Sequence, residues 1–267
     1  MSQFVPSTNT RLYGAAPHAV AVVHGGPGAA GDMAPVAEQL AARRGVLEPL
    51  QTATSVDGQV EELATVLEQH AQLPATLIGY SWGAWLSLIV AARRPALVAK
   101  LILVSSGPFE ERYAAEIMPE RLRRLDNEER NQVEAILSRM SDASGGDDTE
   151  FGRLGELLSK ADAFDPLPGG DEGVAVQAEI YASVWPEAAE LRRSGKLLQL
   201  AGRVQCPVVA VHGAYDPHPA DGIRVPLSRV VADFRFALLP ECGHTPWLER
   251  RARDEFFRLL EAELNDG

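Results

Sequence analysis

The sequence predicts an α/β fold: a mostly parallel sheet of about six strands, helices on both faces, and a helical lid insertion. Two observations predict it. Short apolar runs alternate with helix-like segments in the first and last parts of the chain, which favours parallel strands joined by helices. Between residues 107 and 203 only helical periodicity remains. We expect one domain, with a core of residues 1–106 and 204–267 and a lid at 107–203.

The expected strands are apolar runs that end in glycine, proline or polar residues. They lie near residues 19–23, 46–50, 75–80, 100–105, 207–212 and 234–239.

The expected core helices show amphipathic or fully apolar patterns near residues 32–44, 58–72, 82–94 and 251–264. Asp57 is a plausible N-cap of the second, and Pro95 would close the third. Five further helices are expected in the lid, near residues 111–125, 127–140, 151–161, 174–185 and 187–200, with exposed loops at 141–149 and 165–173. A lid at this place would cover the carboxyl ends of the strands, where open α/β sheets bind ligands.

The segment Gly79-Tyr80-Ser81-Trp82-Gly83 joins an expected strand to an expected helix. A G-x-S-x-G turn in that position forces its serine into a strained conformation and exposes the hydroxyl above the sheet. The two glycines leave room for the adjacent strand and helix. Ser81 is therefore the candidate nucleophile.

A serine hydroxyl needs a base within hydrogen-bond reach, and the base needs a third group to orient it. His244 follows the strand near 234–239, and Asp216 follows the strand near 207–212. Each would lie at the carboxyl end of its strand, as Ser81 does. We predict Ser81 as nucleophile, His244 as base and Asp216 as the group that orients the base.

A glycine-rich loop, His24-Gly25-Gly26-Pro27-Gly28, follows the first expected strand. Two backbone N–H groups usually stabilise the oxyanion of an acyl-transfer reaction. We assign these donors to Trp82, which follows the nucleophile, and to Gly26, with Gly25 as second choice. His24 is expected to brace the loop. Phosphate binding is the rival interpretation, but neither of the two common glycine-rich phosphate patterns is present.

The chain order Ser81, Asp216, His244 resembles that of the α/β-hydrolase family, and the two glycine-rich motifs are similar to its proline iminopeptidase branch. The resemblance covers residues near 19–106 and 204–262. It implies a serine hydrolase whose opening antiparallel hairpin is missing or reduced to about residues 11–14, because only 18 residues precede the first expected strand.

Members of that branch hold the free amino terminus of their substrate with acidic lid residues, and the resemblance makes Glu187 a candidate here. Tyr181 and Trp185 are the expected substrate-binding aromatic residues of the lid. If they are not, the pocket would lie around Trp85, Tyr215 and Trp247.

Three interpretations of the function stay open. The first is hydrolysis of an ester or amide of a small substrate through an acyl-enzyme, and the second is a proline iminopeptidase-like aminopeptidase. The third is a non-catalytic protein that binds a small ligand in the same fold.

Composition and charge limit the binding partners and the cellular location that we expect. With 37 acidic against 25 basic residues the net charge is −12, which disfavours nucleic acid. No apolar stretch is long enough to cross a membrane and the first ten residues do not resemble a signal peptide, so we expect a cytoplasmic enzyme. The two cysteines, Cys206 and Cys242, are expected to be reduced. We expect a small-molecule substrate, no cofactor and no metal; the oligomeric state is not predicted.

Overall fold

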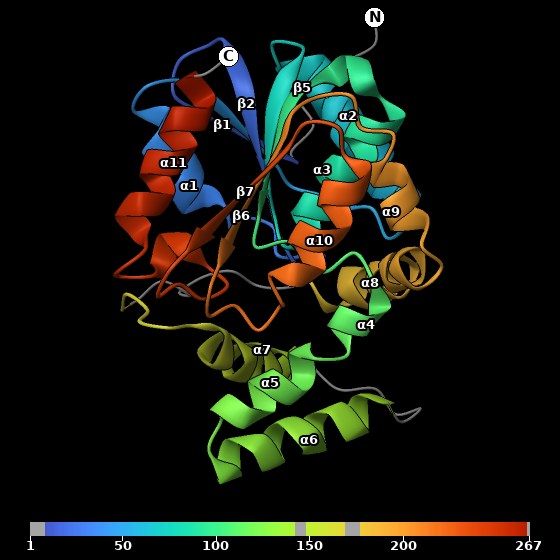
Figure 1. The fold of residues 1–267 in the computed structure, drawn as a ribbon, viewed down its shortest axis with the longest axis vertical. Helices are drawn as coiled ribbons and strands as arrows, with labels where there is room; N and C mark the ends of the chain where they lie inside the picture. The colour runs from blue at the N-terminus through green and yellow to red at the C-terminus, as the bar shows by residue number, and fades with distance from the viewer. Residues whose placement is uncertain (1–8, 142–147, 169–176, 266–267) are drawn as a thin grey trace, which may run out of the picture.

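A computed structural model describes residues 9–141, 148–168 and 177–265 and confirms the predicted fold class (Figure 1). Seven strands form one sheet in the order β1-β3-β2-β4-β5-β6-β7, and every neighbouring pair is parallel except β1 with β3. The strands are β1 Thr10–Tyr13, β2 His18–Val23, β3 Gly45–Pro49, β4 Ala75–Tyr80, β5 Val98–Val104, β6 Val208–Gly213 and β7 Phe234–Leu239.

Both faces of the sheet are covered by helices, as Figure 1 shows. Successive residues of β2 point to opposite faces: Val22 belongs to one buried apolar cluster and Val23 to the other. A strand buried on both faces must be apolar throughout, which explains the continuous apolar runs in the sequence. One face carries α1 Ala34–Ala41 and α11 Arg253–Asn265, and the other carries α2 Val56–His70, α3 Trp82–Arg93, α9 Lys196–Ala201 and α10 Asp221–Val230.

The reduced opening segment that we expected at about residues 11–14 is β1, Thr10–Tyr13. β1 pairs with β3 and not with β2, its neighbour in sequence, with Tyr13 opposite Val46. It therefore forms an antiparallel edge of the sheet. Two local expectations need correction. Ser55 rather than Asp57 caps α2, because the Ser55 hydroxyl accepts from Gly58 N at 3.1 Å. In addition, α10 was not among the helices that we expected.

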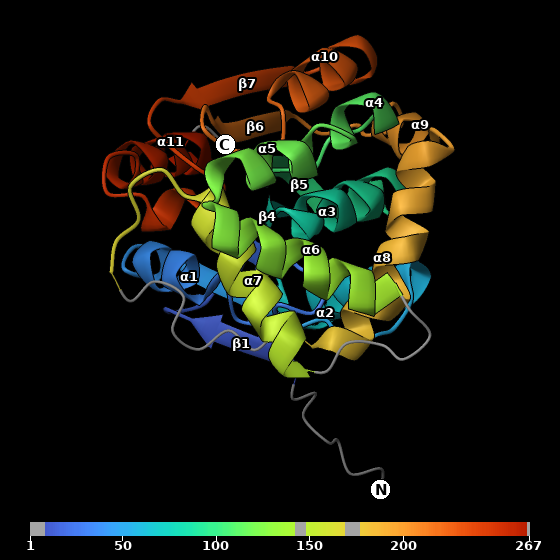
Figure 2. The same ribbon diagram turned by 90° about the horizontal axis from the view of Figure 1, so that it is seen from below.

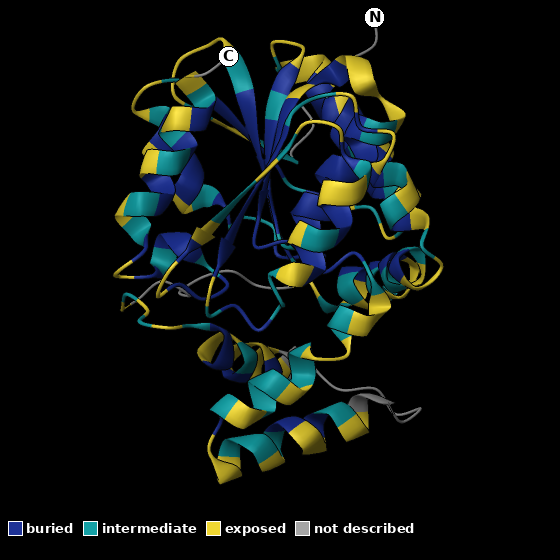
Figure 3. Cartoon of the chain, viewed as in Figure 1, coloured by how far each residue is buried: buried dark blue, intermediate teal, exposed yellow. Residues whose placement is uncertain are grey.

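The remaining helices lie below the sheet, on the side toward which β6 and β7 point (Figures 1 and 2). Three of them, α5, α6 and α7, share a small apolar cluster of their own, and Figure 3 shows that much of their outer surface is exposed. Parts of both loops expected in this region, at 141–149 and 165–173, lie outside the described residues. The helices are α4 Glu111–Ala114, α5 Ile117–Arg124, α6 Asn127–Ser141, α7 Asp148–Asp162 and α8 Ala178–Arg193.

The expected break between residues 185 and 187 is wrong, because α8 runs through Pro186. Pro186 lies on the exposed side of the helix, whereas Ile180, Val184 and Ala188 form its buried stripe. This packing outweighs the backbone hydrogen bond that proline removes. The chain breaks instead at Gly195, whose φ of +74° suits glycine. No helix in the described part of the chain is both long and apolar enough to cross a membrane.

Candidate active site

Ser81 lies in the turn between β4 and α3, and its backbone is strained. Its φ is +51° and its ψ is −113°, outside the regions that an L-residue normally adopts. The flanking glycines make the turn possible. A Cβ on Gly79 would lie 2.3 Å from Gly83 O, and a Cβ on Gly83 would lie 2.2 Å from Val23 O. The turn is therefore too tight for a side chain at position 79 or at position 83.

Asp216 and His244 come from loops that follow β6 and β7, the last two strands of the sheet. His244 Nδ1 donates to Asp216 Oδ2 at 2.8 Å. Both residues are buried. Parallel strands bring their carboxyl ends to one edge of the sheet, so two loops separated by 28 residues meet there.

The two side chains change each other's pKa. Burial disfavours the charged form of His244, but the adjacent Asp216 carboxylate outweighs burial and raises the pKa of the imidazole. Burial would also raise the pKa of Asp216, yet the histidines around it, His244 first, hold that pKa well below its usual value. Asp216 is therefore ionised and accepts hydrogen bonds only.

One cavity of about 360 Å³ contains both Ser81 and His244. Within the described residues no hydrogen bond joins the two side chains; such bonds often tighten only when substrate binds. The cavity is lined by Gly26, Ser81, Trp82, Trp85, Gly107, Pro108, Ala114, Ile117, Met118, Arg121, Leu158, Tyr181, Trp185, Arg192, His218 and His244.

The loop that carries Gly26 is held by two polar side chains, the buried His24 and the half-buried Asp32. His24 Nε2 accepts from Gln51 N at 3.0 Å, so its Nδ1 carries the proton and donates to Gly25 O at 2.9 Å. Burial lowers the pKa of His24 to about 4, which keeps the ring neutral. Gly25 N donates to the Asp32 carboxyl at 3.1 Å. That bond occupies the N–H of Gly25, whereas Gly26 lines the cavity.

Two of the three residues predicted to contact substrate face this cavity. Trp185 stacks on Trp85 with ring centroids 6.0 Å apart, and on Tyr181 at 5.9 Å. Glu187 lies elsewhere. Its carboxylate accepts from Val56 N at 2.8 Å at the start of α2, where a helix N-terminus favours negative charge. This placement corrects the expectation for Glu187.

Trp85 is the one residue of the alternative aromatic set that lines the cavity. Trp247 packs edge-on against Tyr80, with ring centroids 4.7 Å apart. Tyr215 lies under the Arg124 guanidinium, 3.8 Å from its ring centroid.

Sequence reasoning did not identify His218 as part of the site. Its backbone N and its Nδ1 both donate to Asp216 Oδ1, at 2.9 Å and 2.8 Å. Its ring stacks on His244 with centroids 4.5 Å apart and lines the cavity. The signal in the sequence was its place in the same turn as Asp216, two residues later.

Two arginines, Arg121 on α5 and Arg192 on α8, were also missed. Arg121 forms a bidentate pair with Asp162, with bonds of 2.7 Å and 2.6 Å, and the Asp162 carbonyl accepts from His244 N at 2.9 Å. Arg192 pairs with Glu111 at 2.8 Å. Nothing in the sequence pattern set these charges apart from those of solvated helix faces.

Ligand atoms of Asp216, His218 and His244 lie within 4.8 Å of one another, which is close enough for a metal ion. Both imidazoles already donate to the Asp216 carboxylate, and these hydrogen bonds account for the cluster. Cys206 and Cys242 are both free thiols, as expected; burial first, then nearby carboxylates, raises the pKa of Cys242 and makes it a poor nucleophile.

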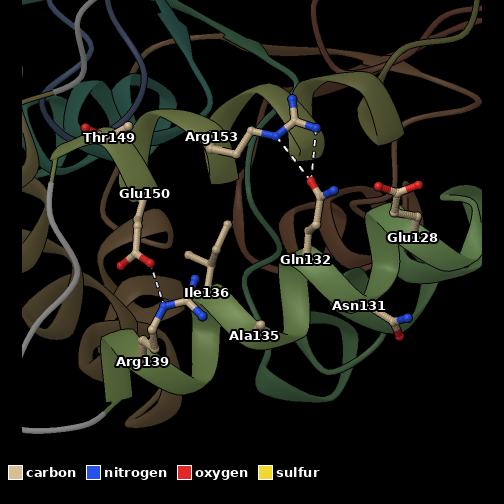
Figure 4. A pocket seen from close by; sticks show the side chains of 9 residues that line it. All are labelled: Glu128, Asn131, Gln132, Ala135, Ile136, Arg139, Thr149, Glu150 and Arg153. Carbon is tan, nitrogen blue, oxygen red and sulfur yellow. Dashed lines mark hydrogen bonds and ion pairs between the residues drawn. The ribbon is translucent and has the colours of Figure 1, made fainter.

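A second hollow lies between α6 and α7 (Figure 4). Both of its arginines are bonded to other residues of the lining: Arg139 to the Glu150 carboxylate and Arg153 to the Gln132 amide oxygen. None of the predicted site residues lines it. The candidate site is therefore the cavity that contains Ser81 and His244.

Comparisons with known proteins agree with this architecture. A family model described as the alpha/beta hydrolase fold matches residues 19–244. A pimeloyl-(acyl-carrier protein) methyl ester esterase of Chromobacterium violaceum is 28% identical over 209 residues, which are 76% of this chain and 75% of that protein.

Solved structures show the same likeness. The crystal structure of VinJ superposes with a TM-score of 0.74 and 20% identity, over 98% of this chain and 97% of that one. A proline iminopeptidase of Mycobacterium smegmatis gives a TM-score of 0.62 and 19% identity, over 96% and 93% of the two chains. At such identities these structures establish a shared fold alone. Because the family model spans most of the chain and the sheet and helices have the matching arrangement, the protein belongs to the alpha/beta hydrolase fold family.

Proposed function

We propose that the protein is a serine hydrolase that cleaves an ester or amide bond of a small substrate through an acyl-enzyme intermediate. One observation carries the proposal: a serine in a strained turn shares a cavity with a histidine whose Nδ1 donates to a buried carboxylate. The hydrogen bond fixes the tautomer of His244, so its Nε2 is the unprotonated nitrogen and can act as a base.

In the first half-reaction, Ser81 Oγ attacks the carbonyl carbon and His244 Nε2 takes the serine proton. Asp216 stabilises the resulting imidazolium, which then protonates the departing alcohol or amine. In the second half-reaction, His244 takes a proton from water, and the hydroxide attacks the acyl-serine. Collapse releases the acid and returns the proton to Ser81.

Negative charge on the carbonyl oxygen would be stabilised by the backbone N–H groups of Trp82 and Gly26. Trp82 is the first residue of α3, so its N–H has no carbonyl one turn earlier to bond. Gly26 lines the same cavity. Both donors are backbone groups held by a helix and by a braced loop, so they cost little reorganisation during the reaction.

An ester is the substrate that the site supports best. An aminopeptidase must hold a substrate ammonium group, and the described residues that line the cavity include no Asp or Glu side chain. The charged side chains in this lining are Arg121 and Arg192, which offer a substrate ammonium no opposite charge. A relative named as a methyl ester esterase supports the same choice. We also propose that residues 107–203 act as the lid and that the enzyme is cytoplasmic.

A fluorophosphonate probe tests the proposal directly. We expect the wild type to be labelled and Ser81→Ala to lose both labelling and turnover, since removing a triad nucleophile costs several orders of magnitude in kcat. Ser87→Ala is the matched control, because Ser87 is buried in α3, the helix that follows Ser81, but does not line the cavity. A panel of p-nitrophenyl esters and aminoacyl naphthylamides then separates esterase from aminopeptidase.

Two outcomes would reject the proposal. Labelling of Ser81→Ala at the wild-type level would exclude Ser81 as the nucleophile. Absence of labelling in the folded wild type would favour a non-catalytic protein that binds a small ligand.

A further inference from the structure

His218 is the unusual feature of this site, because it places a second imidazole on the carboxylate that orients His244. Asp216 Oδ2 accepts from His244 Nδ1 at 2.8 Å, and Oδ1 accepts from His218 Nδ1, also at 2.8 Å. The rings stack with centroids 4.5 Å apart and an interplanar angle of 23°. The two histidines therefore lie side by side, anchored by the same type of bond.

The proton positions follow from these bonds. Asp216 is ionised and accepts only, so His218 Nδ1 must carry a proton. Burial lowers the pKa of His218 to about 4, so the ring is neutral near pH 7 and has no second proton. Its Nε2 is consequently a bare acceptor. Within the described part of the chain Nε2 has no hydrogen-bond partner, and the ring lines the cavity.

The backbone holds His218 in this place. Its own N–H donates to Asp216 Oδ1 at 2.9 Å, and its carbonyl accepts from His212 Nε2 at 2.8 Å. His212 is itself buried at the end of β6. Because the backbone N and O and the ring Nδ1 of His218 are all hydrogen-bonded, the ring has little freedom to turn Nε2 away from the cavity.

We propose that His218 Nε2 is a substrate-binding acceptor that selects esters whose leaving alcohol carries a second hydrogen-bond donor, such as a hydroxyl group. The proposal rests on the proposed function. His244 must reach the leaving-group oxygen to protonate it, and the His218 ring lies directly beside His244. The acceptor is therefore placed for a donor a few bonds beyond the scissile oxygen. The cavity arginines supply donors only and cannot replace it.

The test compares hydroxyethyl butyrate with propyl butyrate, which differ only by a hydroxyl in place of a methyl group. The measured quantity is the ratio of their kcat/KM values. We expect the wild type to prefer the hydroxyethyl ester. His218→Asn keeps an N–H near Asp216 but removes the acceptor, and should lower the ratio by about tenfold, the usual value of one hydrogen bond.

His218→Gln is the matched variant. Its longer side chain places an amide oxygen near the position of Nε2 but loses the bond to Asp216. We expect it to lower turnover of both esters by a common factor and to keep the ratio within about twofold of the wild type. If His218 served only to hold Asp216, His218→Asn would be tolerated, and neither variant would change the ratio of the two kcat/KM values.

The outcomes are separable. An unchanged ratio in His218→Asn, or a wild type without preference for the hydroxyethyl ester, overturns the proposal. If fluorophosphonate labels Ser81 but neither ester is hydrolysed, the substrate class is wrong. If Ser81 is not labelled at all, the proposed hydrolase function itself fails.

Discussion

The strained backbone of Ser81 is held in place by the elements on either side of it. Ser81 adopts a positive φ because the chain must reverse between β4 and α3 within a few residues. Such strain costs about 1–3 kcal/mol and persists only where the surroundings hold it in place. Here α3 supplies that packing, because its buried residues run from Trp82 to Ala91. The neighbouring elements thus stabilise a conformation that the residue alone would avoid.

The raised pKa of His244 predicts the pH dependence of catalysis. The base must be neutral in the free enzyme, so kcat/KM should rise with pH, pass its midpoint above 6.5, the usual pKa of histidine, and then level off. Asp216→Asn removes the charge that raises this pKa. The midpoint should then fall below that of the wild type, and kcat should drop by about four orders of magnitude.

Steady-state kinetics with a p-nitrophenyl ester, together with an NMR titration of His244, measures both effects. A profile that is flat between about pH 5 and 9 while chemistry limits the rate would contradict a histidine base.

At the scale of elements, two sides of α8 make different contacts. Tyr181 and Trp185 face the cavity, whereas Glu187 binds the N-terminus of α2. The helix therefore shapes the pocket with one side and attaches to the core with another. This division explains how an insertion can vary its pocket residues while its position on the core stays fixed.

Trp185→Ala should enlarge the pocket and shift acyl preference toward longer chains. Each methylene accommodated in an apolar pocket is worth about 1–3 kcal/mol, so the ranking of acyl esters should change by about tenfold or more. A series of p-nitrophenyl esters of increasing chain length measures the shift.

Glu187→Gln, on the same helix, is the matched control. It should keep the acyl ranking and lower the free energy of unfolding by about 1 kcal/mol or less, because only a helix-terminus charge is lost. If Trp185→Ala instead lowers turnover of every ester by one common factor, α8 does not set substrate choice.

At the scale of the whole molecule, the helices α4 to α8 are joined to the core through buried polar contacts near His244. Arg121 on α5 pairs with Asp162 at the end of α7, and the Asp162 carbonyl accepts from His244 N. The buried Glu249 carboxylate accepts from Gly243 N and Phe164 N, each at 2.8 Å. The loop that carries His244 is thus held by residues that follow β7 and by residues at the end of α7.

Arg121→Met should destabilise the protein by about 3–5 kcal/mol, because it leaves the buried Asp162 carboxylate without its partner. Denaturant unfolding measures the loss. Replacing both residues, as Arg121→Met with Asp162→Asn, should recover a large part of it, since no buried charge is then unpaired. A cost below about 1 kcal/mol for the single variant, typical of exposed pairs, would show that this pair does not hold α5 against α7.

The sequence by itself determined the features that depend on neighbours along the chain. Continuous apolar runs indicated strands buried on both faces, and G-x-S-x-G between a strand and a helix indicated the turn at Ser81. The placement of Ser81, Asp216 and His244 at one edge of the sheet could also be predicted, because parallel strands place their carboxyl ends together. Each of these inferences needs only local geometry and the topology of a parallel sheet.

The tertiary structure alone decided the features that depend on contacts between distant residues. Glu187 turns toward Val56, 131 residues away, and β1 pairs with β3 rather than with its sequence neighbour. The packed stripe of α8 carries the helix through Pro186, although local propensity predicts a break there. The position of His218 beside His244 could be seen only in the folded structure, where the two rings stack. Side-chain direction and packing energy are set by the partners that the fold brings near, and a single sequence does not name those partners.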